Sequence, residues 1–229
     1  METLHFKQLT KTLKSEGKSA GTINRITTTL NTLTTELRQC GFAAPNVEYK
    51  HQKEPKGRPG FYSEAQMMTL FTNALLWKDK LLLHDSVLFL LKTGCRRGEL
   101  MKLRHSDVDV ENRTITFRDV KTDGDHIIHM HEDLIPVFTR RMQASSNGHV
   151  FDWDYGDQFL NEFKRLQTES NIPHDLVLHS IRHTTATWMI EKEVPLRAIM
   201  GVLNHSDVRT TLKYAKYTDK AVAAAIDVL

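Results

Sequence analysis

Long hydrophobic runs are missing from this 229-residue chain. The apolar stretch at 81–91 is interrupted by His84 and Asp85, so no segment approaches the roughly 20 apolar residues that a membrane-spanning helix requires. Residues 1–17 are polar and lack the apolar region of a secretory signal peptide. We therefore expect a cytoplasmic protein that has no membrane partner.

Cysteine and net charge are also scarce. The two cysteines, Cys40 and Cys95, lie far apart without C-x-x-C spacing, which excludes a disulfide scaffold and suits a reducing compartment. The net charge is only +3, but residues 1–60 carry ten Lys and Arg against five Asp and Glu, whereas the remainder carries 21 against 23. A basic N-terminal segment before a near-neutral body suggests a clamp for a phosphate backbone. A merely solvated basic tail is the plainer alternative.

The N-terminal part of the chain has a clear helical periodicity of apolar residues. Residues 19–39 predict a helix whose apolar residues form one stripe, namely Ile23, Ile26, Leu30, Leu33 and Leu37. Residues 3–15 predict a shorter helix that ends before Gly17. The charged segment 51–60 contains Pro and Gly and has no periodicity, which is typical of a linker. We therefore expect a helical domain at 1–50 and a second domain at 61–229.

The second domain also reads as mostly helical. Ser63 to Gln66 predict a capping box that opens a helix, and residues 83–92 predict a buried helix that ends near Gly94. Residues 113–118 and 126–131 are β-like, with a turn between them. Everything after about residue 132 has a helical pattern. The predicted fold class is therefore mainly α with one small antiparallel β-sheet (α+β).

Residues suited to phosphoryl chemistry gather near the C-terminus. They are His179, Arg182, His205, Tyr214 and Tyr217. An arginine and a histidine three residues apart share one face of a helix, and the planar guanidinium group matches the geometry of a phosphate. A tyrosine close to such cations suggests covalent phosphoryl transfer without a metal. On this ground alone either tyrosine is eligible.

Two earlier segments carry similar groups. Arg96 or Arg97 lies with Glu99 just past the predicted helix end, and Lys121 precedes the predicted hairpin turn. Each has a plainer interpretation, because surface charges and solvated turn lysines are common. The two tyrosines could likewise be core rings with hydrogen-bonded hydroxyl groups.

Taken together, these segments resemble a known set of motifs. They are TGCRRGELMKL at 93–103, LHSIRHTTAT at 178–187 and LNHSDVRTTLKYAKYT at 203–218. In this order they resemble the boxes of the tyrosine recombinases, the phage integrase family, with Lys121 at the position of the family's hairpin lysine. The resemblance runs from about residue 15 to 220. It implies the tyrosine recombinase catalytic fold, preceded by a short, partial helical core-binding domain that clamps DNA.

The resemblance also implies a role for each motif residue. The implied catalytic residues are Arg96, Lys121, His179, Arg182, His205 and Tyr214, with Glu99 as a supporting acid that orients neighbouring cations. Tyr217 lies three residues beyond the family spacing and is expected to be structural or close to DNA, and Arg97 is not the motif arginine. Asn204 stands where the family usually has glycine, which is expected to alter that turn but no catalytic group.

The implied reaction cleaves and rejoins DNA strands through a 3′-phosphotyrosyl intermediate. Arg96 and Arg182 would bind the non-bridging oxygens of the scissile phosphate, and Lys121 would protonate the leaving 5′ oxygen. His205 would orient the phosphate or help to deprotonate Tyr214. Nearby cations are expected to favour the phenolate form of the tyrosine. No metal or other cofactor is implied.

The implied partners are double-stranded DNA with specific recombination sites, further copies of the chain in a homotetramer on two duplexes, and accessory DNA-bending proteins. The apolar segment 221–229 would dock on a neighbouring protomer or on its own domain. An origin in a phage or another mobile element would place the protein in the cytoplasm or nucleoid of a bacterial host.

Three alternatives stay open. His126, His129 and His131 before Glu132 invite a metal site, although no third ligand follows from their spacing. A type IB topoisomerase-like relaxase would share the chemistry and act as a monomer. A non-catalytic DNA-binding relative would keep the fold without the reaction.

Overall fold

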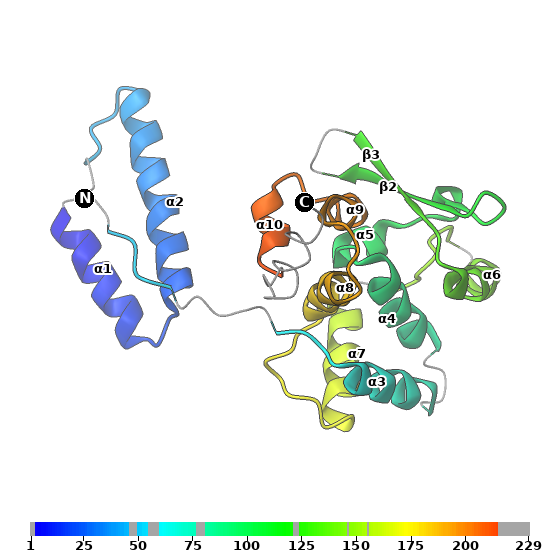
Figure 1. The fold of residues 1–229 in the computed structure, drawn as a ribbon. Coiled ribbons are helices and arrows are strands. Elements are labelled where there is room, and N and C mark those ends of the chain that lie inside the picture. The colour runs from blue at the N-terminus through cyan, green and yellow to red at the C-terminus, as the bar shows by residue number, and fades with distance from the viewer. Residues whose placement is uncertain are drawn as a thin grey trace, which may run out of the picture. The chain divides into compact units, whose positions relative to one another are not determined.

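The computed structural model describes residues 3–45, 50–54, 60–76, 81–120, 124–145, 147–154 and 156–214. The chain divides into two compact units, residues 1–57 and 58–229, and the division falls inside the predicted linker (Figure 1). None of the helices in these ranges is long and apolar enough to cross a membrane.

The first unit contains the two predicted helices. These are α1 (Thr3–Ser15) and α2 (Ala20–Gln39). The hydroxyl oxygen of Ser19 accepts a hydrogen bond from the backbone N–H of Thr22 at 3.2 Å and so caps α2. Gly17 has a φ of +73°, a conformation that glycine adopts without strain, and this explains why α1 ends before it.

The buried face of α2 differs from the predicted apolar stripe. Leu33 and Leu37 are 50% and 37% exposed, whereas Asn24, Thr27 and Thr34 are buried. Threonine can be buried in a helix because its hydroxyl group donates to a carbonyl one turn earlier, as Thr27 does to the carbonyl of Ile23. The prediction of the helix was thus confirmed, while its apolar stripe is buried only in part, because Ile23 is 1% exposed but Leu33 and Leu37 are not buried.

Asn24 ties the following segment to α2. Its side-chain nitrogen donates to the carbonyl of Gln52 at 2.9 Å and to Glu54 Oε1 at 2.7 Å, and its side-chain oxygen accepts from the N–H of Gln52 at 2.7 Å. Residues 52 and 54 therefore belong to the first unit, although they lie in the predicted linker.

The second unit is built around one buried helix (Figure 1). Its helices are α3 (Glu64–Leu76), α4 (Leu81–Thr93), α5 (Arg97–Lys102), α6 (Ile135–Ala144), α7 (Gly156–Glu169), α8 (Ser180–Glu191), α9 (Leu196–Leu203) and α10 (Val208–Leu212), with short 3-10 turns at His105–Asp107 and Glu132–Leu134. Helix α4 packs against α3, α7 and α8. The predicted capping box of α3 is present, because Ser63 and Gln66 exchange backbone-to-side-chain hydrogen bonds.

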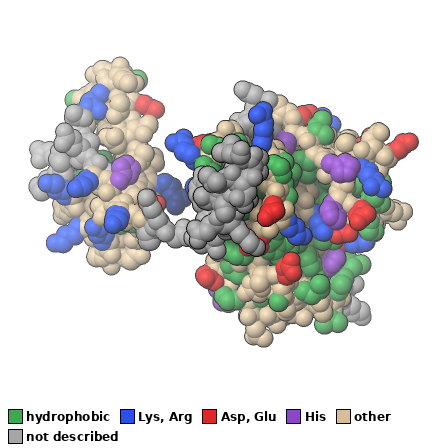
Figure 2. All heavy atoms as spheres, viewed as in Figure 1, with side chains coloured by type: hydrophobic (Ala, Val, Ile, Leu, Met, Phe, Trp, Pro, Cys, Tyr) green, Lys and Arg blue, Asp and Glu red, His purple; other side chains and the backbone are tan. Residues whose placement is uncertain are grey.

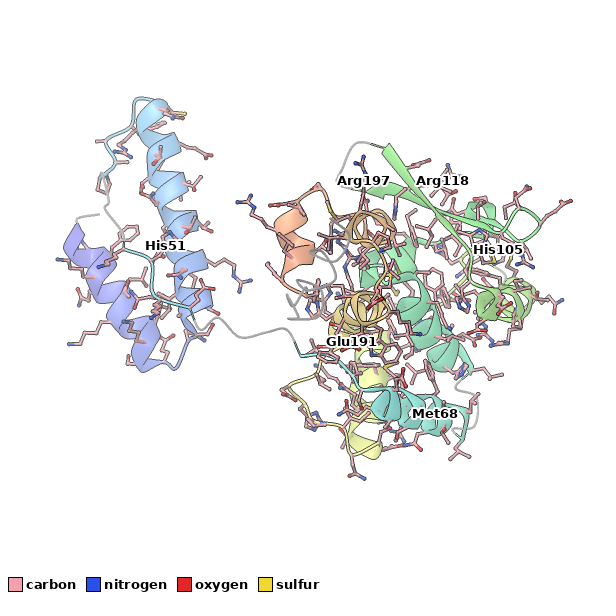
Figure 3. The ribbon with its side chains drawn as sticks, in the orientation of Figure 1. His51, Met68, His105, Arg118, Glu191 and Arg197 are labelled. Carbon is pink, nitrogen blue, oxygen red and sulfur yellow. The ribbon has the colours of Figure 1, made fainter. Side chains whose placement is uncertain are left out.

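A three-stranded antiparallel sheet lies beside these helices. Its strands are β1 (Val108–Asp109), β2 (Thr114–Val120) and β3 (Gly124–His129), in the order β1-β2-β3. The hairpin partners were predicted, whereas β1 was not, since two residues carry no alternation. Arg118 on β2 extends from the sheet toward solvent (Figure 3) and pairs with Asp107 at 2.5 Å. The sheet is joined to α9, because His126 Nε2 on β3 bonds the carbonyl oxygen of Gly201 at 2.7 Å.

Aromatic rings join the layers of this unit. The ring of Phe89 on α4 lies 6.2 Å from that of Phe117 on β2, 5.9 Å from that of Phe138 on α6 and 5.0 Å from that of Phe151, measured between centroids. Each such ring pair stabilises the fold by about 0.5–1.5 kcal/mol beyond the effect of the apolar area that it buries. The core thus holds α4, and the loop that follows it, in a fixed position.

The two units differ in surface charge. Lys and Arg outnumber Asp and Glu on the face of the first unit shown in Figure 2, as the composition of residues 1–60 predicts. On the second unit, charged side chains of both signs are interspersed with His and apolar side chains.

Candidate active site

The site begins where α4 ends. Gly94 has a φ of +62°, and its N–H donates to the carbonyl of Leu90 at 2.8 Å, as expected for the residue that terminates a helix. A Cβ atom at this position would lie 2.4 Å from Leu203 Cδ2. Both the backbone conformation and the close approach of α9 therefore require glycine. The turn directs the next residues, 95–99, toward α8.

Arg96 is held by a carboxylate on its own turn. Glu99 accepts a hydrogen bond from the backbone N–H of Arg96 at 2.6 Å and another from its Nη1 at 2.8 Å. The Arg96 side chain remains 48% exposed, so its guanidinium group is both oriented and accessible. This is the orienting contact that the family pattern predicts for Glu99.

Arg182 is held by main-chain carbonyls instead. Only 5% of the residue is exposed, and its two terminal nitrogens donate to the carbonyls of Gly94 at 2.6 Å and Leu203 at 2.5 Å. These carbonyls lie at the C-terminal ends of α4 and α9, where the helix dipole favours a cation. Burial lowers the pKa of Arg182, as does the positive charge of Arg96. The group stays charged, since an arginine guanidinium group is not deprotonated in proteins at neutral pH.

Two histidines lie one helical turn apart at the start of α8. The rings of His179 and His183 meet edge to face with centroids 4.7 Å apart. Desolvation lowers the pKa of His179 although part of its surface is exposed, and the charges of Arg182 and Arg96 lower it further. The electrostatic influence of both arginines on one ring shows that α5 and α8 bring their cations together.

The turn after α9 positions His205. Asn204 adopts the left-handed conformation, with φ +49° and ψ +55°, which explains both the glycine usual here and the tolerance of asparagine. His205 Nδ1 lies 2.8 Å from Thr211 Oγ1 on α10. Desolvation, followed by the charges of Arg182 and Arg96, lowers the pKa of His205 to about 4.

Tyr214 lies among these arginine and histidine side chains. Its ring packs against Ala186, Ile199 and Leu203, and its hydroxyl oxygen lies 2.5 Å from His183 Nδ1. Burial raises the pKa of Tyr214, and Arg182 lowers it to a smaller extent. The expectation that nearby cations favour the phenolate was therefore wrong for this structure, because desolvation outweighs their attraction.

Sequence reasoning gave His183 no role. The signal was present, because His183 follows His179 by four residues, which places both rings on one face of a helix. Only the folded chain shows that this face meets Tyr214.

Comparison with known proteins identifies the family. Residues 62–221 match the model of the phage integrase family. The chain belongs to this family.

Its relatives within the family are named recombinases and integrases. A probable integrase/recombinase protein of Methanocaldococcus jannaschii is 28% identical over 144 residues, which cover 56% of this chain and 44% of that protein. Tyrosine recombinase XerA of Saccharolobus solfataricus is also 28% identical, over 74% of this chain and 55% of its own length. The chain therefore spans about half the length of these curated relatives.

A solved structure supports the fold of this phage integrase family member. The Tn1549 transposon integrase, solved in complex with transposon right end DNA, superposes with a TM-score of 0.79 at 20% identity. The match covers 99% of this chain and 85% of the integrase. The predicted fold class was thus confirmed.

Some predicted groups are not placed. Lys121, Tyr217 and the segment 221–229 lie outside the described residues. The alternative metal site gains no support, since the part of the chain that is described contains no group of three potential metal ligands. His126 bonds the carbonyl of Gly201, and His131 Nδ1 accepts from the N–H of Asp133.

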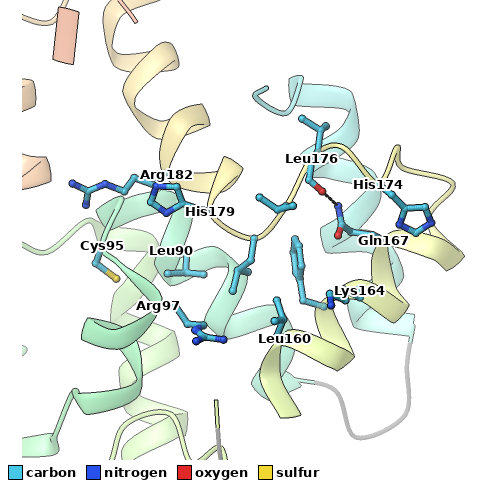
Figure 4. A pocket seen from close by; sticks show the side chains of 13 residues that line it. Leu90, Cys95, Arg97, Leu160, Lys164, Gln167, His174, Leu176, His179 and Arg182 are labelled. Carbon is cyan, nitrogen blue, oxygen red and sulfur yellow. Dashed lines mark hydrogen bonds between the residues drawn. The ribbon is translucent and has the colours of Figure 1, made fainter. Parts of the chain in front are cut away.

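A cavity of about 600 Å³ adjoins this integrase-family site (Figure 4). Arg182 on α8 and His179 at its N-cap form one side of the cavity. Helix α7 forms the opposite side with the apolar side chains of Leu160 and Phe163. The Gln167 amide closes the far end by donating to the carbonyl of Leu176 at 2.6 Å. The cavity therefore leaves space between the start of α8 and helix α7, next to Arg182 and His179.

Proposed function

We propose that this chain is a site-specific DNA recombinase that cleaves and rejoins strands through a phosphotyrosyl intermediate on Tyr214. The observation that carries the proposal is the convergence of Tyr214 with Arg182, His179, His183 and His205, from segments before and after α9. A phenol among phosphate-binding groups is the arrangement that covalent phosphoryl transfer requires.

The two arginines would bind the scissile phosphate. Arg96 presents a half-exposed guanidinium group, and Arg182 uses two terminal N–H groups on carbonyls, which leaves its other three donors for a ligand as far as the described residues extend. Phosphoryl transfer needs chiefly positioning and charge stabilisation in the transition state. Two pre-oriented arginines supply both, and His179 would add a third donor.

The leaving group also needs a proton. In this proposal Lys121 gives a proton to the 5′ oxygen as the bond from phosphorus to that oxygen breaks, and the energy of the bond is kept in the tyrosyl linkage for rejoining. Replacing the 5′ oxygen with sulfur removes the need for the proton. A Lys121→Ala variant should therefore cleave a 5′-thio substrate far better than the normal one, and equal impairment on both would remove Lys121 from this role.

Double-stranded DNA is the proposed substrate and partner. The excess of basic residues in the first unit provides a surface for the phosphate backbone, so we assign that unit to DNA clamping. Recombination between two duplexes further requires four protomers, with the site of each protomer acting on one strand. The proposal includes this homotetramer, accessory DNA-bending proteins and action in a bacterial cytoplasm.

A nicked suicide substrate tests the chemistry. It loses a short fragment after cleavage and so traps the covalent protein–DNA adduct. The proposal predicts an adduct with the unaltered chain and with the Tyr217→Phe variant, and none with Tyr214→Phe, although that variant still binds DNA. An adduct with Tyr214→Phe but not with Tyr217→Phe would contradict the assignment. Bound DNA without any adduct would instead favour a non-catalytic relative, and relaxation of supercoiled DNA by monomers would favour a relaxase.

A further inference from the structure

His183 makes a direct hydrogen bond with the reacting atom of the proposed site, the hydroxyl oxygen of Tyr214. Its Nδ1 lies 2.5 Å from the hydroxyl oxygen of Tyr214, and the two rings are 5.4 Å apart between centroids, inclined by 42°. The ring comes from the fourth residue of α8, a helix that packs against the core helix α4. The contact is therefore made from a rigid element.

The direction of this hydrogen bond follows from the protonation states. Burial raises the pKa of Tyr214, so the phenol keeps its proton at neutral pH. Desolvation lowers the pKa of His183 to about 4, so its ring is neutral and one nitrogen carries a free lone pair. A phenol is a better donor than an imidazole N–H, and an imidazole nitrogen is a better acceptor than a phenol oxygen. The Tyr214 O–H therefore donates to Nδ1, and the proton of the His183 ring is on Nε2.

The other histidines of the site are differently engaged. His205 Nδ1 is bonded to Thr211 Oγ1, and His179 presents its ring edge to face with His183 rather than to the phenol. His183 is thus the histidine with a direct contact to Tyr214 within the described residues.

The charges that surround His183 change when a phosphate binds. His179 and Arg182 on α8, Lys213 after α10 and His205 after α9 all lower the pKa of His183 in the free protein. A bound phosphodiester brings a negative charge to the same cations and offsets their effect. The pKa of His183 then rises above its value in the free protein, while desolvation of the ring still keeps it below the ordinary value, so the ring is unprotonated and able to accept a proton at neutral pH.

We propose that His183 is the general base of strand cleavage, taking the phenolic proton of Tyr214 on its Nδ1. This assignment rests on the proposed function of Tyr214 as the nucleophile. The O–H bond of Tyr214 breaks as the new bond from its oxygen to phosphorus forms. The bond between phosphorus and the 5′ oxygen breaks, and that oxygen receives its proton from Lys121. In rejoining, the 5′ hydroxyl returns its proton to Lys121 as it attacks, and the imidazolium of His183 reprotonates the departing tyrosine.

The central variant is His183→Asn, studied in the full chain. The amide oxygen of asparagine occupies the place of Nδ1, so it still accepts the hydrogen bond of Tyr214 but cannot take the proton. The matched control is His129→Asn, which changes an exposed histidine on β3 of the same unit in the same way. The rate of adduct formation on the suicide substrate is measured in a single turnover between pH 6 and 9.

The general-base role predicts a distinctive pH profile. The unaltered chain and His129→Asn should have rates that change little around neutral pH. His183→Asn should be slower by about 10²–10⁴-fold at pH 7, a typical contribution of a general base. Its rate should rise about tenfold for each pH unit, because solvent must then deprotonate the phenol. Imidazole added to His183→Ala should restore part of the rate.

A more acidic nucleophile separates a general base from a positioning residue. Replacing Tyr214 with 3,5-difluorotyrosine lowers the pKa of the phenol, so it should rescue His183→Asn while helping the unaltered chain little. A slow variant with an unchanged pH profile and no rescue would show that His183 only positions Tyr214. A rate within threefold of the unaltered chain at every pH would also overturn the assignment. If the unaltered chain forms no adduct, the proposed function itself fails, and the role of His183 fails with it.

Discussion

The two arginines of the site, one at the start of α5 and one on α8, are held in opposite ways. Arg96 is half exposed and is oriented by Glu99 on its own turn. Arg182 is buried and is oriented by the carbonyls of Gly94 and Leu203, which belong to two other elements. A local carboxylate makes Arg96 independent of the core, whereas Arg182 joins α4, α8 and α9. A substitution of Arg96 should therefore change activity without changing stability, whereas a substitution of Arg182 should change both.

The largest effect is expected from Arg182→Ala. Adduct formation should fall by about 10³-fold or more, because a donor to the transition state is lost. The free energy of unfolding should also fall, by about 2–4 kcal/mol, since two buried carbonyls lose their donor. Urea unfolding and single-turnover cleavage measure the two quantities. A variant with full stability would show that Arg182 does not join these helices.

Arg96→Ala should separate activity from stability. Cleavage should fall by about 10²–10³-fold, for the same electrostatic reason. The free energy of unfolding should change by less than about 1 kcal/mol, because the ion pair with Glu99 is partly solvated. Arg97→Ala is the matched control from the adjacent position. A greater loss of cleavage with Arg97→Ala than with Arg96→Ala would reverse the assignment of the two arginines.

Acid should lower the free energy of unfolding through two histidines, His183 on α8 and His205 after α9, rather than through groups on α5. His183 and His205 have pKa values of about 4 in the folded chain against an ordinary 6.5. Between these values the unfolded chain binds more protons than the folded chain. The contribution of the two histidines to the free energy of unfolding is therefore fully present above pH 6.5 and is lost as the pH drops from about 6.5 to about 4. The double variant His183→Asn, His205→Asn should flatten this dependence. An equally steep dependence in the double variant would place its origin elsewhere.

Glu99→Gln should have the smallest effect. The amide oxygen still accepts from the N–H of Arg96, but the charge on the orienting group is lost. Because a charge-assisted hydrogen bond is roughly twice as strong as a neutral one, cleavage should fall by about tenfold or less. Single-turnover kinetics with and without high salt measure it. A loss as large as that of Arg96→Ala would mean that Glu99 does more than orient the guanidinium group.

Local features of the sequence predicted most of the fold. The capping box at Ser63, the break at Gly17 and the helix end at Gly94 each depend on a few neighbouring residues, and all three were confirmed. The motif spacing likewise predicted that Arg182 and Tyr214 lie at one site, and in the structure Arg182 acts electrostatically on Tyr214. Such features are readable because their physical cause acts within one or two turns of the chain.

What the sequence could not predict depends on distant contacts. The burial of Asn24 on α2 was not predicted because its hydrogen-bond partners, Gln52 and Glu54, lie 28 and 30 residues away in the sequence. The prediction that Tyr214 favours its phenolate form was wrong because burial raises the pKa of the phenol while charge lowers it. Only the packed structure determines which effect is larger. His183 was overlooked because its partner lies 31 residues away.

Peptide mapping of the trapped adduct tests the central claim most directly. Tyr214 and Tyr217 are separated by Lys216, and Lys213 precedes Tyr214, so trypsin places the two tyrosines in different peptides. After nuclease digestion of the trapped DNA, mass spectrometry locates the residual nucleotide. The account predicts a 3′-phosphate linkage on the peptide of residues 214–216. A nucleotide on the peptide of residues 217–220, or a linkage to the 5′ phosphate, would contradict it.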